Sequence, residues 1–305
     1  MRLEVKNVNL IYPRSILPPM PPYQGFKDVS FTLESGKIYG LIGRNGAGKT
    51  SLLSVLSSYR EQSSGDVLID GTPVFENGEL MQYIKFVYQK DYSSDTESYH
   101  PKLLKFIKKE NQFRPDFDLA YAEELIQKFN LPANKRPHKL SKGQQSALQV
   151  VIGLSSRAKI TIFDEAYVGM DAQTRDLFYK EVLRDQERHP RTIIMSTHLV
   201  SEMEYLFDEV LMIHNGELIK AGAYDEIVAQ GATVTGPNEA VDTFANGKKI
   251  LNTETLGGFK KITLFSDLSD KDRNLAQDLG LEIGSMSLQD LFIQLTGTEG
   301  GLEND

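Results

Sequence analysis

A glycine-rich stretch at residues 43–50, G-R-N-G-A-G-K-T, has the residue types and spacing of a phosphate-binding loop. Residues 37–42 are predicted to form a short buried strand, and residues 50–56 a helix. Glycines let backbone N–H groups turn toward an anion, and the helix N-terminus adds partial positive charge. Lys49 would reach the β- and γ-phosphates, and the Thr50 hydroxyl would hold Mg²⁺. A glycine-rich turn with a surface lysine is the alternative, but the strand–loop–helix context favours binding of a nucleoside triphosphate. The contacts expected from this loop are Gly43, Asn45, Gly46, Ala47, Gly48, Lys49, Thr50 and Ser51.

Two adjacent carboxylates, Asp164 and Glu165, follow an apolar segment predicted as a strand at residues 159–163. In a parallel sheet, the C-terminal ends of the strands meet at the edge where ligands bind. Asp164 would therefore bind Mg²⁺, directly or through water, as the acidic partner of Thr50. Glu165 would orient or deprotonate the attacking water. The alternative is two surface acids at a strand end, which the phosphate-binding loop makes less favourable.

Residues 140–144, L-S-K-G-Q, are predicted to begin a helix, with Ser141 as its N-cap and Gly143 allowing close backbone approach. Taken alone, this is an ordinary capped helix. Together with the loop and the two carboxylates, it resembles the signature motif of the ATP-binding-cassette (ABC) ATPases, usually L-S-G-G-Q. Lys142 replaces the first glycine, whereas Ser141 and Gly143, which touch the γ-phosphate in that family, are kept. The resemblance places Gln144 in the same nucleotide contact.

Four further residues resemble landmarks of this family. Tyr12 resembles the aromatic residue that stacks on adenine, with Tyr23 as a weaker candidate. Gln89 resembles the glutamine that meets Mg²⁺ and couples to the membrane partner. Asp171 resembles the aspartate after the catalytic strand, although it would also serve as a helix N-cap. His198 resembles the histidine that contacts the γ-phosphate, so the resemblance implies a catalytic set of Glu165, His198 and Lys49; a purely structural histidine is the alternative.

The resemblance covers roughly residues 1–225 and implies an α/β fold, that of a P-loop NTPase. An ABC nucleotide-binding domain at residues 1–231 would contain a mixed sheet core, an antiparallel β subdomain and a helical subdomain at about 97–156. Residues 232–305 would form a small C-terminal α/β appendage. In the chain itself, strand and helix patterns alternate as far as residue 220, and from about residue 232 the pattern weakens.

The function implied is ATP hydrolysis with Mg²⁺ in a transporter subunit. Two ATP molecules would be held head-to-tail between this chain and a second ATPase subunit, either an identical copy or a related paralogue. Integral-membrane subunits would carry the substrate, and the chain would lie at the cytoplasmic face of the membrane. The appendage, ending at about residue 296, is similar to those of bacterial exporter ATPases for antibiotics, peptides and lipids, phenol-soluble modulin exporters among them. An importer ATPase, a soluble ABC ATPase acting on ribosomes or DNA, and a non-catalytic regulatory cassette are the alternatives.

The composition of the chain narrows the possible functions and partners. The net charge of −8 argues against nucleic acid as the main partner. The absence of cysteine excludes disulfides and thiolate metal sites. Residues 1–7 alternate polar and apolar side chains, so we expect a strand there and not a secretion signal. No apolar run approaches the roughly 18 residues that a membrane span needs, so we expect any membrane association to be through a partner.

The pattern also predicts the elements that position these residues. We expect strands at 2–11 and 26–34, joined by an extended proline-rich loop at 13–24, and a hairpin turn at Asn215 and Gly216. Further strands are predicted at 66–71, 84–88, 191–195, 209–214, 217–220, 248–251 and 260–265, and helices at 101–109, 118–129, 141–154, 172–188, 270–279 and 287–295. The transported substrate is not predicted.

Overall fold

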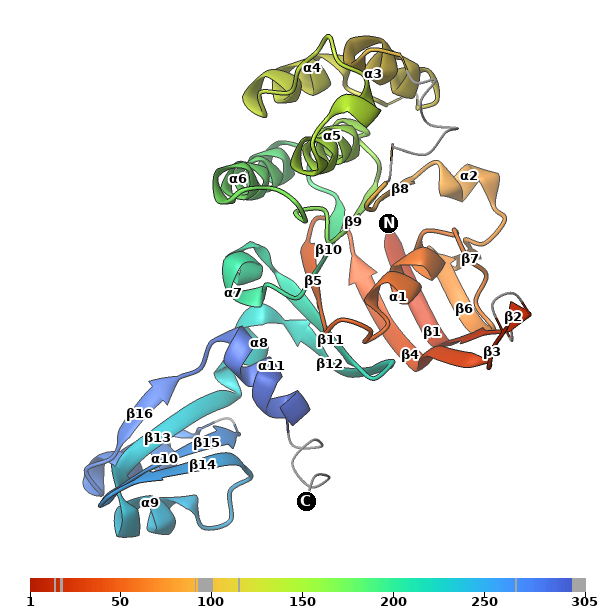
Figure 1. The fold of residues 1–305 in the computed structure, drawn as a ribbon. Coiled ribbons are helices and arrows are strands. Elements are labelled where there is room, and N and C mark those ends of the chain that lie inside the picture. The colour runs from red at the N-terminus through yellow and green to blue at the C-terminus, as the bar shows by residue number, and fades with distance from the viewer. Residues whose placement is uncertain are drawn as a thin grey trace. The chain divides into compact units, whose positions relative to one another are not determined.

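The computed structural model describes residues 1–13, 15–16, 19–90, 92, 101–114, 116–266 and 268–297, without the side chains of 15–16 and 19–20. The chain forms two compact units: the first comprises Met1–His198 and Tyr205–Ala221, and the second Leu199–Glu204 and Gly222–Asp305. In the first unit, helices and strands alternate (Figure 1), which confirms the predicted α/β class.

A six-stranded sheet in the order β12-β11-β5-β10-β9-β8 forms the centre of the first unit. Its strands are β5 (Ile38–Ile42), β8 (Ile84–Val87), β9 (Ile160–Asp164), β10 (Thr192–Thr197), β11 (Glu209–His214) and β12 (Glu217–Ala223). All neighbours from β11 to β8 pair in parallel. β5, β9 and β10 are buried throughout, as expected for strands covered on both faces. Ile42 pairs with Thr197, and Asp164 with Ser196, so three strand ends meet at one edge.

A four-stranded sheet in the order β4-β1-β6-β7 lies beside helix α1 (Figure 1). Its strands are β1 (Arg2–Tyr12), β4 (Tyr23–Glu34), β6 (Ser64–Ile69) and β7 (Thr72–Pro73), paired antiparallel. α1 (Lys49–Leu56) places Leu52, Leu53 and Leu56 in one apolar core with residues of both sheets. Burial on two sides fixes α1, and therefore the loop that precedes it.

The helices α3, α4 and α5 gather at one end of the first unit, next to α6 (Figure 1). The helices of this unit are α1, α2 (Gly78–Met81), α3 (Leu103–Gln112), α4 (Leu119–Lys128), α5 (Lys142–Ser155) and α6 (Ala172–Arg188), with a 3-10 turn at Pro137–Lys139 before α5. Asp118 caps α4 and Asp171 caps α6, each accepting a hydrogen bond from a backbone N–H of the first turn.

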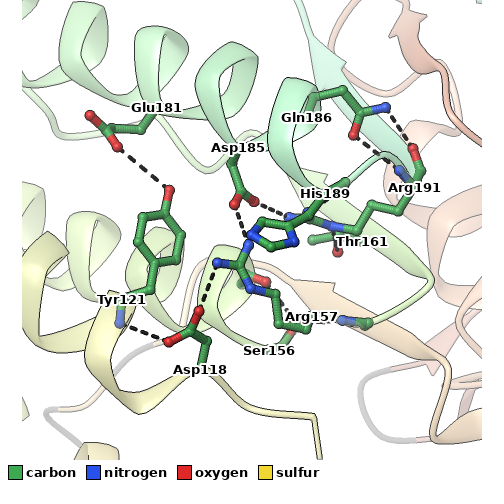
Figure 2. Close-up of polar contacts among 12 residues, drawn as sticks. Asp118, Tyr121, Ser156, Arg157, Thr161, Glu181, Asp185, Gln186, His189 and Arg191 are labelled. Atoms are coloured by element: carbon green, nitrogen blue, oxygen red, sulfur yellow. Dashed lines mark hydrogen bonds and ion pairs between the residues drawn. The ribbon is translucent and has the colours of Figure 1, made fainter.

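A buried ionic cluster connects α4, α6 and the sheet (Figure 2). Asp185 on α6, only 2% exposed, accepts from Arg191 Nη2 at 2.6 Å and also from Arg157. Arg157 Nη2 in turn donates to Asp118 Oδ2 at 2.9 Å. Burial alone would lower the pKa of Arg157, but its bonds to Asp118 and Asp185 outweigh this effect and raise the pKa. Asp185 thus pairs with both guanidinium groups, and Asp118 pairs with one of them.

Replacing Asp185 by asparagine is therefore expected to destabilise the protein. Buried Arg191 loses the carboxylate that pairs with it, and Arg157 keeps only its contact with Asp118. Breaking a buried pair costs about 3–5 kcal/mol of unfolding free energy. Urea unfolding followed by circular dichroism measures this cost. Asp176→Asn is the matched control on the same helix, because Asp176 pairs with Lys180 on the exposed surface and should cost less than about 1 kcal/mol. Equal losses in the two variants would contradict the prediction.

The second unit is built on a four-stranded antiparallel sheet in the order β14-β15-β13-β16. Its strands are β13 (Gly231–Pro237), β14 (Ile250–Leu256), β15 (Phe259–Phe265) and β16 (Glu282–Ser285). The helices are α7 (Val200–Met203), α8 (Tyr224–Ala229), α9 (Asn238–Ala245), α10 (Asp270–Asp278) and α11 (Leu288–Gly297). Val234, Phe244, Ile262 and Leu264 lie in its apolar core. In the described part of the chain, no helix has the length and apolar character needed to cross a membrane.

Several predicted elements differ from the structure. The proline-rich segment is not simply a loop, because Ser15–Ile16 (β2) pairs with Pro19–Met20 (β3) between the ends of β1 and β4. Strand β13, at the centre of the second sheet, was not predicted, since its sequence G-A-T-V-T-G-P carries a weak pattern and sheet neighbours on both sides supply its stability. Residues 97–100 of the predicted helical subdomain lie outside the described residues. The Asn215–Gly216 turn is confirmed, with φ of 48° and 78°.

Candidate nucleotide-binding site

The loop between β5 and α1 has the backbone of an anion-binding site. Gly46 and Gly48 have φ of 82° and 102°, a region that favours glycine. A Cβ added to Gly43 would lie 2.8 Å from the Ile213 carbonyl oxygen, so this position also needs glycine. Gly48 caps α1 without a side-chain hydrogen bond, so the capping residue leaves the first N–H groups of α1 for a ligand.

Lys49 is a buried cation, 5% exposed, folded back onto this loop. Its Nζ donates to the Gly43 carbonyl oxygen at 2.7 Å and to the Arg44 carbonyl oxygen at 3.2 Å. The same Nζ lies 3.2 Å from Glu165 Oε1. An ammonium held at the centre of an anion-binding loop is positioned to bind phosphate oxygens.

Thr50, Asp164 and Ser196 form a second contact set at the edge of the sheet. The Thr50 hydroxyl donates to Asp164 Oδ2 at 2.8 Å, and the Ser196 hydroxyl donates to Asp164 Oδ1 at 2.6 Å. Asp164 is 7% exposed. A hydroxyl and a carboxylate are hard oxygen donors of the kind Mg²⁺ prefers beside phosphate and water, so these residues fit that ion.

Glu165 has a left-handed backbone, with φ of 45°, directly after β9. This is a sparsely populated conformation for a residue with a side chain, and such residues are frequent at functional sites. The Glu165 N–H donates to the Ser196 hydroxyl at 2.9 Å, which holds the turn. Glu165 Oε1 lies 3.2 Å from His198 Nδ1. Lys49, Glu165 and His198 therefore form one continuous set of contacts.

Tyr12 contacts the helix that follows the loop. Its hydroxyl is 2.9 Å from the Ser51 hydroxyl on the first turn of α1. The Arg60 guanidinium stands 4.6 Å from the centre of the Tyr12 ring, and the Tyr23 ring centre is 6.0 Å away. The hydroxyl of Tyr12 thus lies next to the first turn of α1, and the stacking of its ring on a base stays a prediction.

The signature residues line a different cavity, of about 500 Å³. Ser141 and Gln144 cap each other's backbone N–H groups at the start of α5, so the ordinary capping role is present in this structure. Gly143 packs against the segment before α6, where an added Cβ would lie 2.3 Å from the Gly169 carbonyl oxygen. Asp171 lines the same cavity, and hydrogen bonds from Thr174 lower its pKa.

Gln89 lines a third cavity, of about 440 Å³, together with Lys142 and Gly169. The first unit therefore contains three groups of predicted residues: the cluster around Lys49, the signature cavity and the Gln89 cavity. Within the described part of the chain, Ser141 and Gly143 line the signature cavity and have no hydrogen bond to the residues of the Lys49 cluster.

Two residues of the cluster were not predicted. Ser196 bridges Asp164 and Glu165, and only the pairing of β10 with β9 brings it there. The Tyr167 hydroxyl lies 3.1 Å from His198 Nδ1. The signal for Ser196 was its place near the end of a buried strand, two residues before His198, whereas Tyr167 had no such signal.

Comparisons with known proteins agree with this geometry. The model of the ABC transporter family matches residues 26–168. The ABC transporter ATP-binding protein NatA of Bacillus subtilis (strain 168) is 30% identical over 211 residues, which span 66% of this chain and 82% of that protein. YtrB of the same organism, an ABC transporter ATP-binding protein, is 28% identical over 204 residues, 67% of this chain and 68% of YtrB.

A solved structure also has a similar fold. The dimeric, post-hydrolysis structure of the ATP-binding cassette MJ0796 with ADP and Pi has a TM-score of 0.62 at 20% identity, covering 73% of this chain and 98% of that one. Further relatives are named for opposite directions of transport: nitrate import in Synechococcus elongatus and β-(1→2)glucan export in Agrobacterium vitis.

Proposed function

The chain belongs to the ABC transporter family of ATP-binding proteins, and from this premise we propose that it is the ATP-hydrolysing subunit of an exporter. It is an ATPase that uses ATP with Mg²⁺. The observation that supports its site most directly is the contact set joining Lys49, Glu165 and His198 at the edge where β5, β9 and β10 end. Cation, carboxylate and imidazole meet there within hydrogen-bonding distance.

Each residue of this set has a proposed task. The N–H groups of the loop and Lys49 bind the phosphates, and Tyr12 supports the base. Thr50 and Asp164 would hold Mg²⁺, which when bound neutralises phosphate charge. Glu165 takes a proton from the attacking water, and His198 donates a hydrogen bond to the γ-phosphate.

We propose that the site is completed by a second ATPase subunit. Ser141 and Gly143 line a cavity distinct from the Lys49 cluster, so a second copy arranged head-to-tail supplies them to the ATP of the first. ATP then joins the two subunits and hydrolysis separates them, which is a mass-action switch. An identical chain or a related one fills this role.

The exporter direction is supported by the similarity of the chain's end to exporter ATPases. Leu288 of that end donates its N–H to Glu204 Oε2 at 3.0 Å, and Gln289 Oε1 accepts from the Ser201 N–H at 3.2 Å. The exporter-like end therefore packs on the segment of the second unit that directly follows His198 in the chain. An importer ATPase is the second candidate, since a relative named for nitrate import aligns over 68% of the chain.

Purification of tagged Glu165→Gln protein from detergent-solubilised membranes with Mg-ATP tests the proposal. We expect a stoichiometric partner with many membrane spans, at the cytoplasmic face, because ATP holds the assembly closed when hydrolysis is blocked. The Lys49→Ala protein, which cannot bind the phosphates, is the control. It should not retain a second ATPase subunit when Mg-ATP is added.

Reconstitution of the purified complex in vesicles then separates the two directions. ATP supplied on the side of the ATPase should move substrate away from that side in an exporter and toward it in an importer. Recovery of ribosomes or DNA-repair proteins in place of a membrane partner would contradict both readings and favour a soluble ABC ATPase.

A further inference from the structure

Tyr167 lies in the cluster without a role in the account above. It follows Glu165 by two residues and is buried, with 3% exposure. Its hydroxyl oxygen lies 3.1 Å from His198 Nδ1. The same oxygen accepts from the Thr197 hydroxyl at 3.3 Å and faces the His198 N–H at 3.4 Å. The Tyr167 hydroxyl therefore contacts both the backbone N–H and the imidazole ring of His198.

These contacts indicate which atom the Tyr167 hydroxyl donates its proton to. A tyrosine hydroxyl has one proton to donate and lone pairs that accept. Thr197 and the His198 backbone both direct protons toward the oxygen, so among these three contacts His198 Nδ1 is the acceptor for the Tyr167 proton. A neutral imidazole that accepts at Nδ1 carries its own proton on Nε2.

Glu165 acts on the same nitrogen in the opposite sense. Its Oε1 lies 3.2 Å from His198 Nδ1, and a carboxylate only accepts, so it favours a proton on Nδ1. In the Nδ1–H tautomer, the imidazole would donate a hydrogen bond to the Glu165 carboxylate, which is the group that must accept a proton from water. The bare Nε2 lone pair would then face the anionic γ-phosphate. Both consequences oppose hydrolysis.

We propose that Tyr167 is a positioning residue that holds His198 in the Nε2–H tautomer. Its hydroxyl occupies Nδ1, leaving Nε2–H to donate to the γ-phosphate and Glu165 Oε1 to accept the water proton. The proposal rests on the roles proposed above for His198 and Glu165. Because the His198 side chain is 37% exposed, polar contacts at Nδ1 are needed to orient its ring, and the Tyr167 hydroxyl is the contact there that can donate a proton to Nδ1.

The Tyr167→Phe variant tests this by removing the hydroxyl and keeping the ring. We expect kcat to fall about 10-fold, the effect of losing one hydrogen bond in the transition state, with KM for Mg-ATP within about two-fold of wild type. Tyr39→Phe is the matched control: Tyr39 is a buried tyrosine of β5 whose hydroxyl accepts from the Glu34 N–H, so its loss should leave kcat unchanged. Thermal melting of both variants separates a loss of folding from a loss of rate.

A mutant cycle and a spectrum distinguish positioning from packing. In a His198→Ala background, Tyr167→Phe should lower kcat no further, and an equal loss in both backgrounds would overturn the proposal. ¹⁵N spectra of the five histidines, with His198 assigned from the His198→Ala protein, should show Nε2–H in wild type and a shift toward Nδ1–H in Tyr167→Phe. An Nδ1–H signal in wild type would refute it. If His198→Ala hydrolyses ATP at the wild-type rate, the role of His198 itself is overturned. If His198→Ala loses activity but Tyr167→Phe hydrolyses ATP at the wild-type rate, only the role of Tyr167 is overturned.

Discussion

Glu165→Gln protein is expected to hydrolyse ATP about 100- to 10,000-fold more slowly than wild type, the range that a positioned general base contributes. The amide keeps the size of the side chain but cannot accept a proton from water. It also removes the negative charge that lies 3.2 Å from Lys49 Nζ, so Mg-ATP should bind at least as tightly as before. Single-turnover release of phosphate measures the rate, and size-exclusion chromatography with Mg-ATP detects the trapped dimer.

Glu187→Gln makes the same chemical change on the exposed side of α6 and should leave both quantities unchanged. Glu165 contacts Lys49 and His198, so the effect is expected for Glu165 and not for Glu187. Hydrolysis by Glu165→Gln within a few-fold of wild type would refute the role of Glu165 as base, while leaving the phosphate-binding loop untouched.

Lys49→Ala protein is expected to lose most of its affinity for Mg-ATP. Hydrogen bonds from a charged donor are worth about 1.5–3 kcal/mol each, so losing two to the phosphates weakens binding by roughly 150- to 25,000-fold. The truncation also leaves Glu165 without its cation in the loop, where its repulsion opposes the triphosphate. Equilibrium dialysis measures the affinity directly.

Thermal melting supplies an independent readout of the same prediction. Mg-ATP at 100 times its Kd stabilises a folded protein by about 2.7 kcal/mol, and this gain should vanish in Lys49→Ala. Lys27→Ala, an exposed lysine of β4, should melt and respond to ATP like wild type. An undiminished ATP-dependent rise in Tm for Lys49→Ala would mean that the phosphates bind elsewhere.

The sequence predicted the parts of the site that are contiguous along the chain. Strand β5, the glycine loop and α1 follow one another within 20 residues, and local backbone preference is enough to place Gly48 and Lys49 at a helix N-terminus. The same holds for Asp164 and Glu165 at the end of an apolar strand. The Asn215–Gly216 turn was predicted for the same reason, since both residues tolerate positive φ.

The order of strands in the sheet determined which residues far apart in the sequence come into contact, and the sequence pattern did not predict this. The hydrogen bond from Thr50 to Asp164 joins residues 114 positions apart, and Ser196 joins the same carboxylate because β10 lies between β5 and β9. The pairing of β9 with β10 brings the turn after β9 next to the end of β10, where the Tyr167 hydroxyl lies 3.1 Å from His198 Nδ1. Tertiary contacts likewise stabilised β13, whose own pattern is weak, between two neighbouring strands. The sequence by itself determined the chemistry through residue types and local spacing, whereas the pairing of distant strands alone determined which of those residues touch.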